Sequence, residues 1–465
     1  MAAELRAAFG RPGMLTTDAD VLTSVTSDYR GWFSAPAVAL LRPNTVDEVR
    51  HAVHVCAERG FKIVPQGGNT SMCGAAVPSD DGNRWVVLSL ASLNRIRSVD
   101  PASWSIVAEA GCTIGQIQSA ARGAGRHFGL DFGARDSALL GGAIATNAGG
   151  MNVVRYGNCR DLVLGLEVVL ADGRLWSGLK CLRKDNTGID LKHLFIGSEG
   201  TLGIITAAAL KLASPEDWAQ SALIAVPSIE AASELAERTL TLAGRDLSAI
   251  ELASLVGVKG ACERMLNCRP PLPLREDWYV LVRLAGPAGS DLLEGLIAGA
   301  LDRQLCSDAV IAQSSAQEAQ LWAIRDAFSS FHRYLGQSIR FDYSVPIGQI
   351  PALYGRLCGA IRRLAPDFVP FVFGHLGDGN LHFSACQPPH AEPGSFMAKK
   401  AHIEDAANEV VWQLGGSISA EHGIGQLHRR ELAQQHSALD VELMRRMKHA
   451  LDPDDVLNPG KSFAR

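Results

Sequence analysis

The stretch Phe61-Lys-Ile-Val-Pro-Gln-Gly-Gly-Asn-Thr-Ser71 decides how the first part of this chain folds. Its apolar start, residues 61–64, is typical of a buried strand, and Pro65 ends that strand. Consecutive glycines then allow backbone N–H groups to point into one concavity, which can bind an anion such as phosphate. A single Gly-Gly pair is more often a plain surface turn, so a second signal is needed.

The residues around this stretch predict regular structure. Residues 37–41 are typical of a short buried strand. Thr45 and Glu48 have the spacing of a capping box at the start of a helix, and Thr113 and Gln116 repeat that spacing further on. The sequence therefore predicts a strand–helix–strand unit that leads directly into the glycine-rich loop.

The second signal is a run of small residues, Gly-Gly-Ala-Ile-Ala-Thr-Asn-Ala-Gly-Gly, at positions 141–150. Such a run offers little bulk to a core and suits a backbone that lies close against another molecule. Two loops of this kind fit a dinucleotide better than a single phosphate. Neither loop has the Gly-x-Gly-x-x-Gly pattern of nicotinamide-binding folds.

A possible metal site is indicated by Gly374-His-Leu-Gly-Asp-Gly-Asn-Leu-His382. The Asp-Gly turn folds the chain into a hairpin, so His375 and His382 can face each other. Glu421, in a glycine-rich stretch with His422, is a candidate third ligand. Two histidines and one carboxylate suit a divalent transition metal and leave room for substrate. The alternative is a hairpin whose two histidines are merely hydrogen-bonded.

Two arginines are candidates for binding a substrate carboxylate. The planar guanidinium groups of Arg325 and Arg340 match the two oxygens of a carboxylate. Each has an acidic neighbour, Asp326 or Asp342, so an ordinary ion pair is the alternative for either one.

Composition limits the function classes. The net charge of the 465 residues is −5 and no Lys/Arg block stands out, which argues against a nucleic-acid partner. No apolar run is long enough for a transmembrane segment. Residues 1–29 lack secretory and transit patterns, so a cytoplasmic location is expected. The ten cysteines form no Cys-x-x-Cys pair, so an iron–sulfur cluster is not expected.

Six stretches together resemble the FAD-linked 2-hydroxy acid dehydrogenases of the vanillyl-alcohol oxidase superfamily. This family includes D-lactate, glycolate and D-2-hydroxyglutarate dehydrogenases, and the D-2-hydroxyglutarate enzymes resemble the chain most. The stretches are residues 65–71, 141–150, 197–206 (GSEGTLGIIT), 375–382, 421–423 (EHG) and 458–461 (NPGK). Each is weak alone, but they stand in family order.

The resemblance implies an α+β fold: a vanillyl-alcohol oxidase-type FAD-binding domain with a ferredoxin-like cap domain that binds substrate. We expect these domains at residues 1–213 and 214–439, with a C-terminal segment, residues 440–465, that returns to the FAD domain. Because Asn69 stands in the first loop, where some relatives carry a FAD-linked histidine, non-covalent FAD is expected. The residues that the resemblance assigns to FAD are Pro65, Gln66, Gly67, Gly68, Asn69, Thr70, Ser71, Gly74, Asp131, Ser137, Gly141, Gly142, Ala145, Thr146, Asn147, Gly149, Gly150, Tyr156, Gly157, Glu199, Gly200, Gly203, Ile204, Ile205 and Asn458.

The resemblance also implies a mechanism. A divalent metal ion, zinc or manganese, would be held by His375, His382 and Glu421 and would lower the pKa of the substrate hydroxyl. His422 would then take the hydroxyl proton, and the hydrogen on C2 would pass as hydride to the flavin N5.

The substrate-binding positions implied by the family are Arg325, Ser329, Arg340, Ser384 and His422. In the 2-hydroxyglutarate enzymes the positions of Ser329 and Arg340 carry Thr and Lys, which hold the distal carboxylate. Arg340 keeps that positive charge and favours D-2-hydroxyglutarate. Its longer, flatter side chain, and Ser384 in place of Asn, leave D-malate, D-lactate and glycolate as alternatives.

Other partners and other classes of protein stay open at this point. Electrons would leave to a quinone, a cytochrome or an electron-transferring flavoprotein, and a homodimer is the generic expectation. A metal hydrolase, suggested by two histidines and a glutamate alone, would be colourless. A flavin-binding module without turnover would be yellow, and no 2-hydroxy acid would bleach it.

Overall fold

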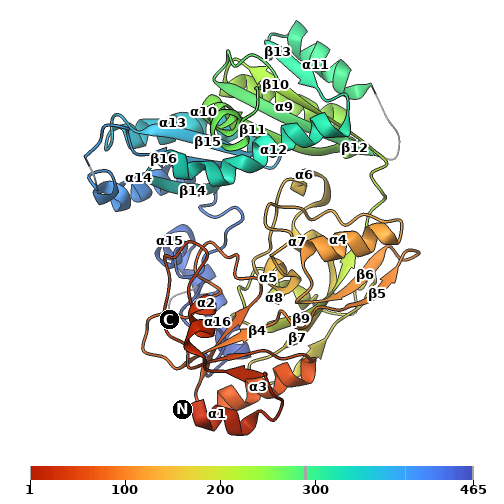
Figure 1. Ribbon diagram of the computed structural model, residues 1–465, viewed down its shortest axis with the longest axis vertical. Coiled ribbons are helices and arrows are strands. Elements are labelled where there is room, and N and C mark those ends of the chain that lie inside the picture. Colours follow the sequence, from red (N-terminus) through yellow and green to blue (C-terminus); the bar gives the residue numbers. More distant parts are fainter. Residues whose placement is uncertain (1, 287–290, 393, 463–465) are drawn as a thin grey trace. The chain divides into compact units, whose positions relative to one another are not determined.

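The computed structural model describes residues 2–286, 291–392 and 394–462, and the chain forms two compact units (Figure 1). Unit 1 comprises Met1–Gly149, Tyr156–Pro215 and Glu421–Arg465, and unit 2 comprises Gly150–Arg155 and Glu216–Ala420. The first division lies close to the expected boundary at residue 213. The chain rejoins unit 1 at Glu421, earlier than the expected residue 440. The short excursion of the chain into unit 2 at Gly150–Arg155 was not expected.

Unit 1 contains a four-stranded sheet in the order β1-β2-β4-β3, in which β2 and β3 run parallel to β4. The strands are β1 (Leu15–Thr16), β2 (Ala39–Leu41), β3 (Lys62–Gln66) and β4 (Trp85–Ser89); the helices before β3 are α1 (Ala2–Ala8), α2 (Ala19–Thr26) and α3 (Val46–Glu58). Buried Val49 and Val53 of α3 belong to the core cluster that contains Ile63 and Val86. The predicted strand–helix–strand unit is therefore present, and the glycine-rich loop follows β3. The strand does not end at Pro65 as expected, because Pro65 and Gln66 still pair with Leu88 and Ser89 of β4.

The second sheet of unit 1 is antiparallel, with the order β5-β6-β9-β7-β8. Its strands are β5 (Ile96–Asp100), β6 (Ser105–Glu109), β7 (Val163–Val169), β8 (Leu175–Ser177) and β9 (Ile204–Lys211). The further helices of unit 1 are α4 (Ile114–Gly123), α5 (Leu140–Ala145), α7 (Cys159–Leu162), α8 (Lys192–Phe195), α15 (Arg429–Gln435) and α16 (Ala438–Leu451), whereas α6 (Val153–Tyr156) begins in the segment that belongs to unit 2. The run of small residues at 141–150 thus begins as a short helix, α5, beside β9.

The two predicted helix caps differ. Thr113 and Gln116 form a complete capping box at α4. At α3, Thr45 accepts from the Glu48 N–H as predicted, but the Glu48 carboxylate accepts from the Asn44 N–H at 2.6 Å and pairs with Arg11 at 2.7 Å. An arginine within reach therefore displaces the reciprocal half of the predicted box.

The end of the chain packs beside β3. The N–H of Ile63 donates to the Val456 carbonyl, and the N–H of Asn458 donates to the Ile63 carbonyl, both at 2.8 Å. Buried Asp452 fixes the preceding turn, because its carboxylate accepts from the N–H groups of Val456 and Leu457 at 2.8 and 2.7 Å. The C-terminal segment thus belongs to unit 1.

Unit 2 is built on one antiparallel seven-stranded sheet in the order β13-β10-β12-β11-β15-β16-β14. The strands are β10 (Trp218–Val226), β11 (Leu247–Ser254), β12 (Trp278–Gly286), β13 (Asp308–Ile311), β14 (Ser338–Ser344), β15 (Val369–His375) and β16 (Asn380–Cys386). The helices are α9 (Ile229–Ala243), α10 (Leu255–Gly260), α11 (Leu292–Asp302), α12 (Ser315–Phe331), α13 (Ile350–Arg362) and α14 (Lys400–Gln413).

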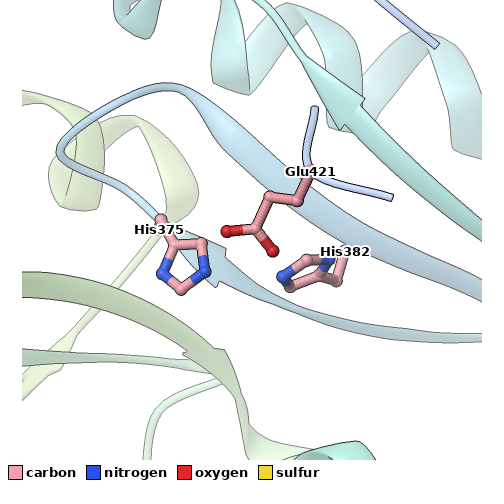
Figure 2. A group of neighbouring side chains, drawn as sticks. All are labelled: His375, His382 and Glu421. Carbon is pink, nitrogen blue, oxygen red and sulfur yellow. The ribbon is translucent and has the colours of Figure 1, made fainter. Parts of the chain in front are cut away.

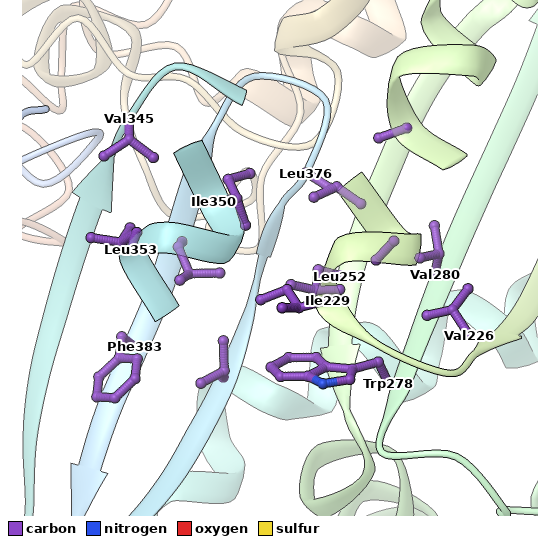
Figure 3. Packing of buried hydrophobic residues seen from close by; sticks show 14 of the residues in the cluster. Val226, Ile229, Leu252, Trp278, Val280, Val345, Ile350, Leu353, Leu376 and Phe383 are labelled. Carbon is purple, nitrogen blue, oxygen red and sulfur yellow. The ribbon is translucent and has the colours of Figure 1, made fainter. Parts of the chain in front are cut away.

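The alternation of side chains along each strand gives this sheet two different faces. One face packs against α9, α11, α13 and α14 in a large apolar core, in which Leu252, Val280 and Phe383 lie among helix residues such as Ile229 and Leu353 (Figure 3). The other face packs against α10 and α12 and carries, besides apolar residues, the polar side chains described below. The sheet thus separates a hydrophobic core from a polar site.

The excursion Gly150–Arg155 is anchored in unit 2 by a partly buried polar cluster. The Arg155 guanidinium donates to the Ser248 hydroxyl at 2.9 Å and the Ala285 carbonyl at 2.8 Å, and it lies 3.4 Å from the Glu216 carboxylate. Because a buried charge needs such partners, Arg155 ties this short segment to β11 and β12.

Candidate active site

The two histidines of the predicted hairpin come together on the polar face of the unit 2 sheet. His375 ends β15, and His382 lies in β16 after the Asp378-Gly379 turn. Their ring centroids are 5.4 Å apart. Gly379 has a φ of +83°, and a Cβ there would lie 2.0 Å from the Val345 carbonyl oxygen, so glycine is required at this turn.

Each histidine has a carboxylate directly opposite on the neighbouring strand. The β-sheet register pairs His375 with Glu251 of β11, and His382 with Asp342 of β14. The Nδ1 atom of His375 lies 2.6 Å from Glu251 Oε1, and the Nδ1 atom of His382 lies 3.4 Å from Asp342 Oδ1. Because an ionised carboxylate only accepts, the contact with Glu251 favours the His375 tautomer that carries its proton on Nδ1 and has the Nε2 lone pair available for a metal ion. Asp342 has the same position relative to His382.

Glu251 stays ionised although it is buried. Burial alone would raise its pKa, but the neighbouring Arg325 and His375 lower the pKa below its ordinary value. The sequence analysis did not single out Glu251 or give Asp342 this role. A charged residue inside the apolar strand Leu247–Ser254 is the signal that could have identified Glu251.

Glu421 completes the group that the sequence predicted (Figure 2). One ligand atom from each of His375, His382 and Glu421 lies within 4.8 Å of the others. Glu421 directly follows Ala420, whose N–H donates to the Asp342 carbonyl at 3.0 Å. This hydrogen bond fixes the backbone before Glu421 to β14, the strand that contains Asp342. Asp342, Glu421 and His422 form a second group of the same kind. The first donor set suits Zn²⁺ or Mn²⁺.

Arg325 contacts this group from helix α12. Its Nε donates to Glu251 Oε2 at 2.8 Å, and its Nη2 lies 3.4 Å from the ring nitrogens of His375. The partner of this buried ion pair is therefore Glu251, a residue far away in sequence, and not the adjacent Asp326. Ser329 lies one turn further along α12 and is exposed.

Arg340 and Ser384 are directly opposite each other in the pairing of β14 with β16. Arg340 is exposed, whereas Ser384 is buried and its hydroxyl lies 2.9 Å from His332 Nε2. His332, which the sequence analysis missed, is buried against the ring of Phe371. The Ser384 hydroxyl therefore already has an imidazole partner.

Unit 1 contains a cavity of about 300 Å³ at the two glycine-rich stretches, a size within the range of small-molecule sites. Among the residues that the sequence analysis assigned to FAD, the cavity lining includes Pro65, Gly67, Gly68, Asn69, Thr70, Ser71, Gly141, Gly142, Ala145, Thr146, Gly149, Glu199, Gly200, Gly203, Ile204 and Ile205. Glu421 and His422 line the same cavity. The sequence analysis did not predict the other residues of the cavity lining, which are Met72, Ala75, Ala76, Leu90, Phe132, Ala134, Ala138, Leu139, Ala143 and Ala148.

The polar atoms of this cavity fit a polar ligand. Asn69 Oδ1 and Ser71 Oγ are buried and have no hydrogen-bond partner among the described residues, which is costly unless a ligand or water satisfies them. A Cβ at Gly68 would lie 2.0 Å from the Ser137 carbonyl oxygen, so only glycine allows this loop to pack so closely. These features match a dinucleotide whose phosphates lie against glycine-rich backbone.

The other residues assigned to FAD lie outside this lining: Gln66, Gly74, Asp131, Ser137, Asn147, Gly150, Tyr156, Gly157 and Asn458. Several have structural partners. Gln66 donates to the carbonyls of Val25 and Ala76, both at 2.8 Å, and Asp131 pairs with Arg135 at 3.0 Å. Their contact with FAD stays a prediction.

Two family models match the chain. The model described as the FAD binding domain matches residues 37–178, and the model described as FAD linked oxidases, C-terminal domain, matches residues 216–462. The second match covers more than half of the chain and ends within the C-terminal segment of unit 1.

Curated relatives are similar over most of their length. The D-2-hydroxyglutarate dehydrogenase of Xanthomonas citri pv. viticola is 36% identical, with 93% of this chain and 90% of the relative covered. The mitochondrial D-2-hydroxyglutarate dehydrogenase of Bos taurus is also 36% identical, with 97% and 81% covered. The D-2-hydroxyglutarate–pyruvate transhydrogenase of Saccharomyces cerevisiae is 30% identical, with 95% and 89% covered.

Solved structures support the fold. A p-cresol methylhydroxylase matches with a TM-score of 0.76 at 16% identity, covering 99% of this chain and 96% of that chain. An alkyldihydroxyacetonephosphate synthase matches with a TM-score of 0.73 at 17% identity, covering 99% and 84%. The fold is thus of the vanillyl-alcohol oxidase type, as expected.

The chain belongs to the FAD-linked oxidase family, to which its D-2-hydroxyglutarate dehydrogenase relatives also belong. It is therefore an FAD-dependent oxidoreductase, and the alternatives of a metal hydrolase or a module without turnover do not hold. Within the described residues, no helix is both long and apolar enough to cross a membrane. The bovine relative is mitochondrial by name, and the cytoplasmic location expected for this chain stays a prediction.

Proposed function

We propose that this enzyme oxidises D-2-hydroxyglutarate to 2-oxoglutarate and requires a divalent metal ion besides FAD. The supporting observation is the register of β14 and β16, which places Arg340 opposite Ser384, and Asp342 opposite His382. Paired residues point to the same face, and two residues along a strand span about 6.8 Å. The Arg340 Nε donates to the Ser338 hydroxyl at 3.2 Å, on the side away from Asp342. Because Arg340 is exposed, its long side chain can turn toward a distal carboxylate of a substrate whose hydroxy-acid end lies at the histidines.

The roles of the residues follow from their chemistry. His375, His382 and Glu421 would hold the metal ion, which when bound supplies a Lewis acid for the C2 hydroxyl. Glu251 and Asp342 keep the Nε2 lone pairs of the two histidines available. His422 accepts the hydroxyl proton as general base. Arg325 and Ser384 would bind the hydroxy-acid end, and Ser329 would bind the distal carboxylate together with Arg340.

FAD, when bound, supplies the acceptor for the hydrogen that leaves C2 as hydride. The glycine-rich stretches at residues 67–71 and 141–149 would hold it without a covalent link, since Asn69 occupies the first loop. In total the substrate loses one hydride, from C2, and one proton, from the hydroxyl group. The two electrons must then pass to a second acceptor.

The second acceptor is a quinone, a cytochrome, an electron-transferring flavoprotein or a 2-oxo acid. The last class is suggested by the yeast relative, whose name describes a transfer to pyruvate. Steady-state turnover with each class, at saturating D-2-hydroxyglutarate, distinguishes them.

Replacing Arg340 by methionine tests the choice of substrate. We expect the KM for D-2-hydroxyglutarate to rise about 10- to 100-fold, because a hydrogen-bonded charge on the distal carboxylate is lost. The kcat for D-lactate, which lacks that carboxylate, should not change. The matched control is Arg333→Met, which removes an exposed arginine in the same unit.

Equal losses for D-2-hydroxyglutarate and D-lactate in R340M would contradict the assigned role of Arg340. If the wild-type enzyme prefers D-malate, D-lactate or glycolate, the proposed type of reaction would stand and the proposed substrate would be wrong.

A further inference from the structure

We infer that Glu199 is a positioning residue for the loop at residues 421–426, which carries His422, and that its carboxylate is not a ligand of FAD. This inference rests on the proposed function for the role of His422, but its structural basis is independent of the substrate. It reassigns Glu199, which the sequence placed among the FAD-binding residues.

Both carboxylate oxygens of Glu199 are engaged by this loop and by the end of the chain. Oε1 accepts from the backbone N–H groups of Ile424 and Gly425, at 2.9 and 3.2 Å. Oε2 accepts from the Gly425 N–H at 2.9 Å and from the Ser462 hydroxyl. Glu199 is buried, which raises the pKa of its carboxyl group, and the hydrogen bonds from Ser462, Gly425 and Ile424 oppose this shift by stabilising the ionised form.

The loop is shaped to receive this carboxylate. Gly423 has a φ of +79°, and a Cβ there would lie 2.1 Å from Glu199 Oε1. On its other side the loop is held by Cys73, whose carbonyl accepts from the Gln426 N–H at 2.8 Å. A Cβ at Gly425 would lie 2.1 Å from that same carbonyl oxygen. The two glycines are therefore needed because the backbone is held between Glu199 and Cys73.

The C-terminal segment supports Glu199 in turn. The Asn458 side-chain amide donates to the Glu199 carbonyl at 2.8 Å. Buried Lys461, next to Ser462, donates to the carbonyls of Ala75 and Val77. Burial lowers the pKa of Lys461 to about 7, and the nearby Glu199 carboxylate opposes this shift. The end of the chain thus fixes Glu199, and Glu199 fixes the backbone two residues after His422. A base must be held close to its productive geometry, and a shift of about 1 Å can cost about a hundredfold in rate.

The test compares Glu199→Gln with Glu109→Gln by hydrogen–deuterium exchange. Glutamine keeps the size of the side chain but puts an NH₂ group among the backbone donors. The control, Glu109, is another buried carboxylate of unit 1, bound by Arg95 and Arg97. We expect exchange in the peptide spanning residues 421–426 to be at least about tenfold faster in E199Q, and as in wild type in E109Q.

Kinetics and flavin content complete the test. We expect E199Q to keep its FAD and to lose about 10- to 100-fold in kcat, with little change in KM. Ser462→Ala, which removes one donor, should show a smaller effect of the same kind and serves if E199Q does not fold. Unchanged exchange, faster exchange with kcat within about twofold of wild type, or loss of FAD with unchanged exchange would overturn the inference. A wild-type enzyme that does not oxidise D-2-hydroxyglutarate would contradict the proposed function. It would not contradict this inference, because hydrogen–deuterium exchange at residues 421–426 is measured without substrate.

Discussion

Replacing His382 by alanine is expected to lower kcat by about a thousandfold or more while FAD stays bound. The imidazole would supply one of three ligands to the metal ion, and loss of Lewis acidity at the hydroxyl costs several kcal/mol of transition-state stabilisation. FAD should remain, because the cavity at the glycine-rich stretches is lined by unit 1 residues and His382 belongs to unit 2. Metal analysis should show about one ion per chain in wild type and almost none in the variant.

The control is His390→Ala, because His390 is an exposed histidine of the same unit. It should keep wild-type metal content and rate. A wild-type enzyme that carries no metal, resists chelators and keeps its kcat in H382A would contradict the metal site. The two histidines would then be a hydrogen-bonded pair supported by Glu251 and Asp342.

Replacing His422 by alanine is expected to reduce kcat by about 10²- to 10⁴-fold, the range for loss of a general base, with KM nearly unchanged. Metal content should stay at the wild-type level, because the proposed ligands are His375, His382 and Glu421. FAD content should also stay, since backbone and small side chains form most of the cavity lining. Anaerobic flavin reduction measures the step that is lost.

Metal content in H422A also separates the two candidate donor groups. If the ion were held by Asp342, Glu421 and His422, H422A would lose it and H382A would not. That pattern would contradict the role of His422 as base. Loss of metal in H382A alone agrees with the proposed assignment.

Local sequence patterns predicted those parts of the fold that local chemistry determines. The capping box at Thr113 and the turn at Asp378-Gly379 each depend on residues a few positions apart. The strand predicted at residues 61–64 is also present as β3, but its predicted end at Pro65 was wrong, because β3 continues to Gln66. His375 and His382 are neighbours because one tight hairpin carries both. For these elements the spacing of residue types was sufficient.

Contacts between distant segments could not be predicted in this way. The excursion Gly150–Arg155 belongs to unit 2 because Arg155 bonds to residues of β11 and β12, and its own sequence carries no sign of this. Arg325 pairs with Glu251 and not with the adjacent Asp326, because strand β11 and helix α12 meet only in the folded unit. The carboxylates behind the histidines follow from sheet register, which the individual strands do not specify.

The most direct test of the central claim is the visible spectrum of the purified enzyme during anaerobic addition of D-2-hydroxyglutarate. We predict the yellow spectrum of oxidised FAD and its bleaching at a rate that D-lactate, glycolate and D-malate do not reach. A chelator-treated sample should stay yellow until metal is restored. Flavin that stays oxidised with D-2-hydroxyglutarate, in protein that contains both FAD and metal, would contradict the account.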